Sequence, residues 1–180
     1  MLLLAAWMLV SAPRERAVLI YPRERVWFRR AFHTSHQREL QRQLQMQYAL
    51  EVHDQVASDE ALFAIDIRGA KLLVMSAHGC PYGMAFDGKH RTTLDESDQA
   101  RLAAFFSQLA PDATIILQSC YTGLGFARIV KKAAGPDRRV IAADGEIPRD
   151  GVVITSLEPL DVAITCRDER GRAWDCKIRL

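Results

Sequence analysis

The chain has few of the features that would place it directly in a class of proteins. Its 180 residues include four cysteines, which are too few for a disulfide scaffold at this length. The formal net charge is +2, whereas nucleic-acid-binding domains usually carry a strong basic excess, so we expect no nucleic-acid partner. The sequence also lacks a Gly-x-Gly-x-x-Gly or Walker loop, which argues against a nucleotide-binding domain, and we expect no cofactor.

Long apolar runs are also missing. The most apolar stretch, residues 1–10, is too short to cross a bilayer, so we expect no membrane span. It is similar to the core of a signal peptide, but no basic residue precedes it, and Pro13 and Arg14 follow without a clear small-residue cleavage site. We therefore favour a cytoplasmic protein in which residues 1–10 form a buried strand or helix, and secretion is the alternative.

Short apolar runs alternate with amphipathic stretches from about residue 17 to residue 144. This alternation predicts one domain with a three-layer α/β/α sandwich and a mainly parallel central sheet. The expected strands are 16–22, 50–56 (half-exposed or at an edge), 71–77, 114–120 and 139–143. The expected helices are 35–50, 58–65, 93–110, opened by a capping box from Thr93 to Glu96, and 123–134. A small hairpin turning at Asp87-Gly88 is expected before the third helix.

The pattern changes after Asp144. Three short runs at 152–157, 162–166 and 173–178 predict a β-rich tail, over about 152–180, within the same single domain 1–180. Cys166 and Cys176 lie symmetrically about Gly171 in what reads as a hairpin, so they could face each other, and a disulfide there would require an oxidising compartment. The cysteine spacing does not match a zinc site, and we expect no metal.

Two of the expected strands stop at residues that can carry chemistry. The run 71–77 leads into His78-Gly79, and the run that begins at Thr114 ends at Cys120, which follows His78 by 42 residues. In an open α/β sheet, ligands and reactions belong at the carboxyl ends of the strands. If these two strands are parallel neighbours, the imidazole and the thiol project from one sheet edge, as a cysteine nucleophile and its base require.

The neighbouring residues add to this hypothesis. His78 would take the thiol proton and later return it to a leaving amine. A thiol has an ordinary pKa of about 8.5, so it is mostly protonated at neutral pH. The positive end of a helix that starts near Gly123 would favour the thiolate. The backbone N–H groups of Gly79 and Cys120 would form an oxyanion hole. Cys80 lies on the His-bearing segment, and we expect it to be a packing residue.

The order strand-His-Gly, then strand-x-x-Cys, resembles the caspase–hemoglobinase fold of clan CD over about residues 17–143. The caspase signature Gln-Ala-Cys-x-Gly is matched at its Gln and its Cys, with the glycine one residue late. The Ser-Cys-x-Thr-Gly form is more similar to the bacterial branch that includes the CHAT proteases and the toxin-autoprocessing domains. The residues that carry this resemblance are Gln118-Ser119-Cys120-Tyr121-Thr122-Gly123.

The resemblance implies a caspase-like cysteine endopeptidase that cuts a protein or peptide through an acyl-enzyme thioester and can process itself. His78 and Cys120 would form the catalytic dyad. Asp144 or Glu146 would line the specificity pocket and favour Arg or Lys in the substrate, although Gln118 stands where metacaspases carry an acidic residue. The family often completes its groove by an internal cut, and the segment Gly145 to Gly151 is the obvious place for one.

Other functions stay open at this point. A catalytically inactive caspase-like module, which would bind a regulatory protein partner, would keep the same fold. A Cys-x5-Arg phosphatase loop is absent, because Phe126 occupies the arginine position. A class I glutamine amidotransferase places its cysteine before its histidine, which is the reverse of the order here.

Overall fold

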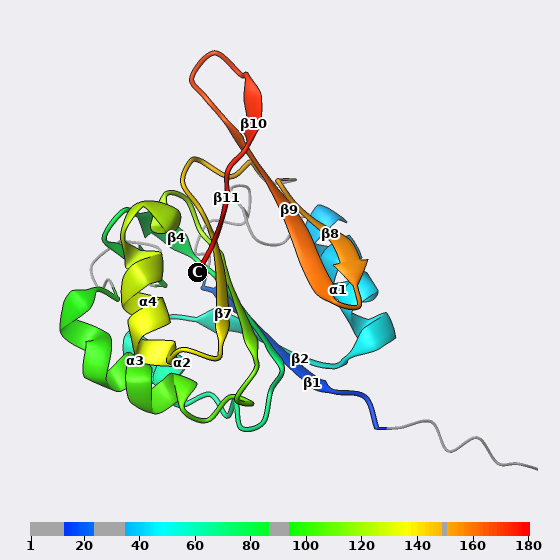
Figure 1. Cartoon of the computed structure of the whole chain (residues 1–180), viewed down its shortest axis with the longest axis vertical. Coiled ribbons are helices and arrows are strands. Elements are labelled where there is room, and N and C mark those ends of the chain that lie inside the picture. Colours follow the sequence, from blue (N-terminus) through cyan, green and yellow to red (C-terminus); the bar gives the residue numbers. More distant parts are fainter. Residues whose placement is uncertain (1–12, 24–34, 87–93, 149–150) are drawn as a thin grey trace, which may run out of the picture.

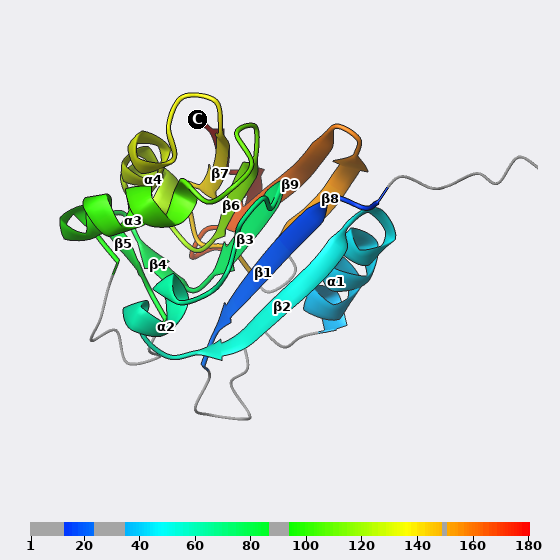
Figure 2. The same ribbon diagram turned by 90° about the horizontal axis from the view of Figure 1, so that it is seen from below.

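A six-stranded sheet forms the centre of the protein. The computed structural model describes residues 13–23, 35–86, 94–148 and 151–180. The strand order is β11-β7-β6-β3-β1-β2. The strands β1, β2, β3, β6 and β7 are parallel to one another, and β11 runs antiparallel to β7 (Figures 1 and 2). The predicted α/β class with a mainly parallel sheet is therefore confirmed. The strands are β1 (Arg16–Pro22), β2 (Ala49–Val56), β3 (Leu72–Ser76), β6 (Thr114–Gln118), β7 (Arg139–Ala143) and β11 (Lys177–Arg179).

The position of each strand in the sheet explains its sequence. Every residue of β3 and β6 is buried, because both faces of the sheet are covered and a central strand has no solvent side. The strand β2 instead mixes exposed and partly buried positions, and it lies at the edge of the sheet. The alternation of apolar and polar residues in this strand had predicted that position.

Three helices cover one face of the sheet: α2 (Asp59–Phe63), α3 (Gln99–Phe106) and α4 (Phe126–Ala134) (Figures 1 and 2). The side of α3 that the sequence marked as apolar is buried there with β3 and β6. Ser58 caps α2 by accepting the Ala61 N–H, as the sequence indicated. The core on this face includes Leu73, Met75, Leu102, Phe106, Ile115, Leu117, Phe126 and Val130.

The opposite face is covered by one helix, α1 (Ser35–Gln47), and by the hairpin of β8 (Val152–Leu157) and β9 (Leu160–Arg167). The tail is therefore part of a layer and does not simply follow the sandwich. The predicted single strand over 173–178 is wrong, since the chain changes sheets at Cys176. The segment β10 (Ala173–Asp175) pairs with β9 and is exposed, and β11 pairs with β7 in the central sheet (Figure 1).

The structure describes a hairpin and a capping box near the His-bearing segment. The strands β4 (His78–Cys80) and β5 (Gly83–Ala85) form a hairpin that turns at Pro81-Tyr82, while the predicted turn at Asp87-Gly88 lies outside the described residues. Thr93 also lies outside them. Within the described residues, a capping box is formed by Asp95 and Asp98 around the short 3-10 helix η2 (Glu96–Asp98).

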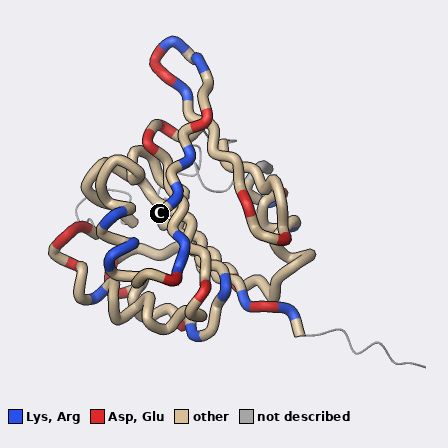
Figure 3. Tube along the Cα trace, in the orientation of Figure 1, with Lys and Arg blue, Asp and Glu red and all other residues tan. Residues whose placement is uncertain are grey.

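Two further observations concern the chain as a whole. None of the described helices has both the length and the apolar character needed to cross a membrane, and residues 1–10 lie outside the described part of the chain. Figure 3 shows acidic and basic positions interspersed along the described trace, including the turn between β9 and β10.

Tyr21 connects β1 to the helix α1 that packs over it. Its hydroxyl donates to Gln37 Oε1 (3.1 Å) and accepts from Gln41 Nε2 (3.3 Å). The ring is fully buried, and this burial raises the pKa of Tyr21 to about 12, since a phenolate would lose its hydration there. The folded protein therefore holds the Tyr21 proton more tightly than the unfolded chain, in which a tyrosine has a pKa of about 10.

This difference predicts a loss of stability in alkali. The contribution of Tyr21 should be complete below pH 10 and should decline as the pH rises toward 12, by on the order of 2–3 kcal/mol in total. We expect Tyr21→Phe to remove this part of the pH dependence in denaturant unfolding and to cost about 1 kcal/mol at neutral pH through the lost hydrogen bonds. Tyr82→Phe, on an exposed side chain, is the matched control, and an unchanged alkaline slope in Tyr21→Phe would contradict the assignment.

Candidate active site

The strands that lead to His78 and Cys120, β3 and β6, are adjacent and parallel. The strand β3 pairs with β6 in continuous register from Leu72 opposite Thr114 to Ser76 opposite Gln118. At the end of this pairing, Ser76 Oγ donates to Gln118 Oε1 at 2.7 Å inside the protein. The adjacent, parallel pairing of the two strands on which the dyad hypothesis depends is therefore present.

The contact continues beyond the ends of the two strands. Ser119 Oγ donates to the Ala77 carbonyl (2.9 Å), and Gly79 lies directly against the same segment. A Cβ placed on Gly79 would lie 2.2 Å from Ser119 Oγ and 2.5 Å from the Cys120 carbonyl oxygen, so only glycine fits at this position. His78 and Cys120, both partly buried, thus lie on segments that touch at the carboxyl edge of the sheet.

The hairpin β4–β5 determines how the Gly79 backbone is directed. Met84 exchanges both of its backbone hydrogen bonds with Leu94 on its outer side (3.1 and 2.8 Å). Met84 is therefore not hydrogen-bonded to Gly79, its partner across the hairpin. The Gly79 N–H consequently points away from β5, which is the direction that a donor to an external carbonyl would need.

The loop after Cys120 is held by a set of local contacts. Tyr121 adopts a left-handed conformation (φ 58°), and the buried Thr122 hydroxyl donates to the Ser119 carbonyl at 3.0 Å. The Phe126 N–H donates to the Pro81 carbonyl (2.8 Å), so the start of α4 is tied to the β4–β5 turn. The predicted start of this helix at Gly123 is wrong by three residues, because a 3-10 turn, η3 (Thr122–Leu124), comes first.

The electrostatic environment of Cys120 differs from the prediction. Burial raises the pKa of the Cys120 thiol above its ordinary value, and the nearby Glu146 carboxylate raises it further. The nearby backbone N–H groups of Ile147 and of Cys120 itself act in the opposite direction, but the net pKa shift is upward. The expectation that the helix start favours a thiolate is therefore wrong for this state of the protein.

The segment after β7 produces part of this environment. The Tyr121 N–H donates to the Gly145 carbonyl (2.9 Å), which places the residues after Ala143 beside the Cys120 loop. Glu146 is exposed, and its charge acts on the Cys120 sulfur. Of the two acidic residues predicted to line a specificity pocket, Glu146 is the one that the structure connects to the thiol.

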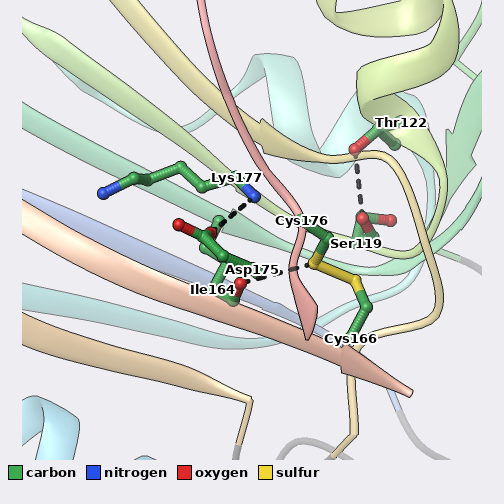
Figure 4. Close-up of a disulfide and its surroundings, with 7 residues drawn as sticks. All are labelled: Ser119, Thr122, Ile164, Cys166, Asp175, Cys176 and Lys177. Carbon is green, nitrogen blue, oxygen red and sulfur yellow. Dashed lines mark hydrogen bonds between the residues drawn. A yellow bond between two sulfur atoms is a disulfide. The ribbon is translucent and has the colours of Figure 1, made fainter. Parts of the chain in front are cut away.

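Cys166 and Cys176, which the sequence suggested could face each other, form a disulfide (Figure 4). Asp144, the other acidic residue of the predicted pocket, lies beside this disulfide. The disulfide is buried, and Gly145 packs against it: a Cβ on Gly145 would lie 3.0 Å from Cys166 Sγ and 2.6 Å from Trp174 Cζ2. The spacing of residues in the sequence could not reveal that Asp144 lies near the two cysteines, since β8 and most of β9 separate Asp144 from Cys166 along the chain. The only signal was the position of Asp144 at a strand end.

Two other features of the site were missed. Cys80 is an exposed free thiol, so its prediction as a packing residue is wrong. Exposed apolar side chains also gather on the loops that border Cys120: Tyr82 in the β4–β5 turn, and Tyr121 and Leu124 after the cysteine. The Pro81 contact with Phe126 brings these loops together.

Comparisons with known proteins add no relationship: no family model matches the chain, and no curated protein matches it in sequence.

The Cys120 environment predicts how its reactivity depends on pH. In a Cys80→Ser background, which leaves Cys120 as the only thiol outside the disulfide, alkylation by iodoacetamide should be slow at neutral pH and should accelerate into the alkaline range. Glu146→Gln removes the repelling charge, so its rate profile should shift to lower pH. Glu169→Gln, in the turn after β9, is the control; identical profiles for all three proteins would contradict the role of Glu146.

The close approach of Gly79 predicts a sensitive position. Gly79→Ala must move either the hairpin or the Cys120 backbone, and a displacement of about 1 Å at a reacting centre can cost roughly 100-fold in rate. We expect this variant to lose at least that much of any Cys120-dependent activity while it still folds, as checked by thermal unfolding. Gly69→Ala, which strains a left-handed backbone position (φ 70°) but brings the added carbon within 4 Å of no neighbour, is the control for general destabilisation, and equal activity of both variants would contradict the prediction.

Proposed function

We propose that this protein is a cysteine endopeptidase with a caspase-like architecture, in which Cys120 is the nucleophile and His78 the general base and acid. The observation that carries the proposal is the contact of the His78-Gly79 segment with Ser119-Cys120, just beyond the ends of the parallel neighbouring strands β3 and β6. This contact between the two chain segments supports a site that combines an imidazole, a thiol and a glycine amide. The resemblance of the motifs to clan CD supports the same conclusion.

The reaction uses these groups in sequence. Cys120 Sγ attacks the scissile carbonyl carbon while His78 accepts the thiol proton, and the carbonyl oxygen becomes an oxyanion. The N–H of Gly79, directed away from β5, and that of Cys120, which lies beside its own sulfur, stabilise this charge. His78 returns the proton to the leaving amine as the C–N bond breaks, and water then hydrolyses the thioester.

The substrate follows from the surroundings of Cys120. The exposed carboxylate of Glu146 favours a basic residue, Arg or Lys, before the cleaved bond. The exposed Tyr82, Tyr121 and Leu124 offer apolar surface for neighbouring peptide side chains. The segment Gly145 to Gly151 itself contains one basic residue, Arg149, which makes it a candidate for self-processing.

Self-processing would also change the nucleophile. The carboxylate of Glu146 and the N–H of Ile147 both act on Cys120, and the net effect of its surroundings is a raised pKa. A cut after Arg149 would free this segment from the chain that continues into β8. The uncleaved protein would then be the less reactive form.

A second candidate is an inactive module that keeps the fold and binds a regulatory partner. The observation in its favour is the same raised pKa of Cys120, because a protonated thiol is a weak nucleophile. The two candidates differ in whether the protein turns over any peptide.

A positional-scanning peptide library tests the proposal. We expect cleavage after Arg or Lys, its loss in Cys120→Ala, and a decrease of at least about 100-fold in His78→Ala because the base is removed. Mass spectrometry of the incubated wild type should reveal a cut after Arg149 that Cys120→Ala lacks.

The control is His53→Ala, since His53 lies on the edge strand β2, where it contacts Glu51. Turnover that persists in Cys120→Ala would exclude the dyad mechanism. The absence of turnover by both the intact and the Arg149-cleaved wild type would favour the inactive module.

A further inference from the structure

Three potential metal ligands from distant parts of the chain meet beside the central sheet. Asp144 follows β7, Cys166 lies in β9, and Cys176 lies between β10 and β11. One carboxylate oxygen and the two sulfurs all lie within 4.8 Å of one another. Both cysteines are buried, and Asp144 is partly buried.

The Asp144 carboxylate is poorly accommodated in the disulfide form. Its Oδ1 atom is shielded from water and has no hydrogen-bond partner among the described residues. A buried acceptor without a partner costs free energy, so its presence in a folded protein calls for a physical reason. A cation bound beside it would provide one.

The other polar groups nearby do not take that role. Lys177 is adjacent to Cys176 in sequence, but its Nζ is directed to Asp161 (3.3 Å) and to the Val162 carbonyl (2.6 Å). Figure 4 shows this side chain extending away from the two sulfurs. The Asp144 N–H donates to the Cys176 carbonyl (3.1 Å), which fixes the backbone of two of the ligands but leaves Asp144 Oδ1 without a hydrogen-bond partner among the described residues.

We propose that the reduced protein binds one Zn²⁺ through the thiolates of Cys166 and Cys176 and the carboxylate of Asp144, with water as the fourth ligand. Two thiolates and one oxygen suit zinc, which binds sulfur at about 2.3 Å and carboxylate oxygen at about 2.0–2.2 Å in a tetrahedron. Such bond lengths place ligand atoms somewhat under 4 Å apart by roughly tetrahedral geometry. In the disulfide form the three donors lie within 4.8 Å of one another, and reduction frees the two bonded sulfurs to move apart to the tetrahedral spacing.

The disulfide and the zinc site exclude each other. A dithiol or phosphine reductant supplies two electrons, the S–S bond breaks, and two protons are taken up to give two thiols. Zinc then displaces those two protons as it binds the thiolates. Oxidation of the pair to the disulfide returns two electrons to the oxidant and releases the metal. This site is independent of the proposed peptidase activity.

Zinc binding can be measured directly. The chain is prepared in a Cys80→Ala/Cys120→Ala background, which removes the other two thiols, then reduced with a phosphine, incubated with Zn²⁺, and desalted. Elemental analysis should give one zinc for each reduced chain and none for the disulfide form of the same protein. Co²⁺ in place of zinc should give the absorption of a tetrahedral thiolate site.

Two variants distinguish this site from adventitious binding. Asp144→Asn should weaken zinc binding by more than the roughly 10–100-fold that loss of an outer-shell partner costs, while Cys166→Ser/Cys176→Ser should abolish it. Asp175→Asn, beside Cys176 but outside the cluster, should bind as the parent does. Absence of zinc from the reduced parent, or equal affinity in the parent and Asp144→Asn, would overturn the proposal. Thermal unfolding shows that each variant is folded, and the comparison of reduced with disulfide parent needs no substitution in the cluster.

Discussion

The close packing of Gly79 against the backbone of Ser119 and Cys120 is the constraint on which the candidate site depends. The parallel register of β3 and β6 brings the two chain segments to the same edge, but it does not determine how near they approach. The absence of a side chain at Gly79 allows van der Waals contact between the two backbones. The Pro81 carbonyl, next along the hairpin, can then accept the Phe126 N–H and fix the start of α4. The close packing at Gly79 thus helps to position the β4–β5 hairpin, the Cys120 loop and the start of α4.

Local sequence patterns predicted most of this framework because its strands and helices have strong local signals. Buried strands read as continuous apolar runs, and the apolar face of α3 repeats at helical spacing. The capping box of Asp95 and Asp98 was not predicted; it follows directly after Leu94, whose pairing with Met84 across the chain no local pattern reveals. The departure of the chain from β10 into β11 at Cys176 depends on long-range pairing in the same way.

The Cys120 environment shows where local reasoning about chemistry fails. A helix start after a cysteine favours the thiolate, and that argument requires only neighbouring residues. In the folded protein, burial and the charge of Glu146, which is distant along the chain, have the larger effect. Gly145 holds this segment in place by accepting the Tyr121 N–H. The strand pattern therefore predicts the position of Cys120 better than the residues next to Cys120 predict how readily its thiol ionises.

The Cys166–Cys176 pair connects that segment to the redox conditions around the protein. Closing a loop of this size with a disulfide stabilises a fold by roughly 2–3 kcal/mol in the chain-entropy model, but only where thiols are oxidised. The bond holds Cys176 at the point where the chain enters β11, and β11 pairs with β7, from which Asp144 and Gly145 continue to the Cys120 loop. A cytoplasmic protein would lose this crosslink and expose two thiols to the unpaired Asp144 carboxylate. A metal held by these three groups would restore the connection between the tail and β7, so that the same three residues could serve in both oxidation states.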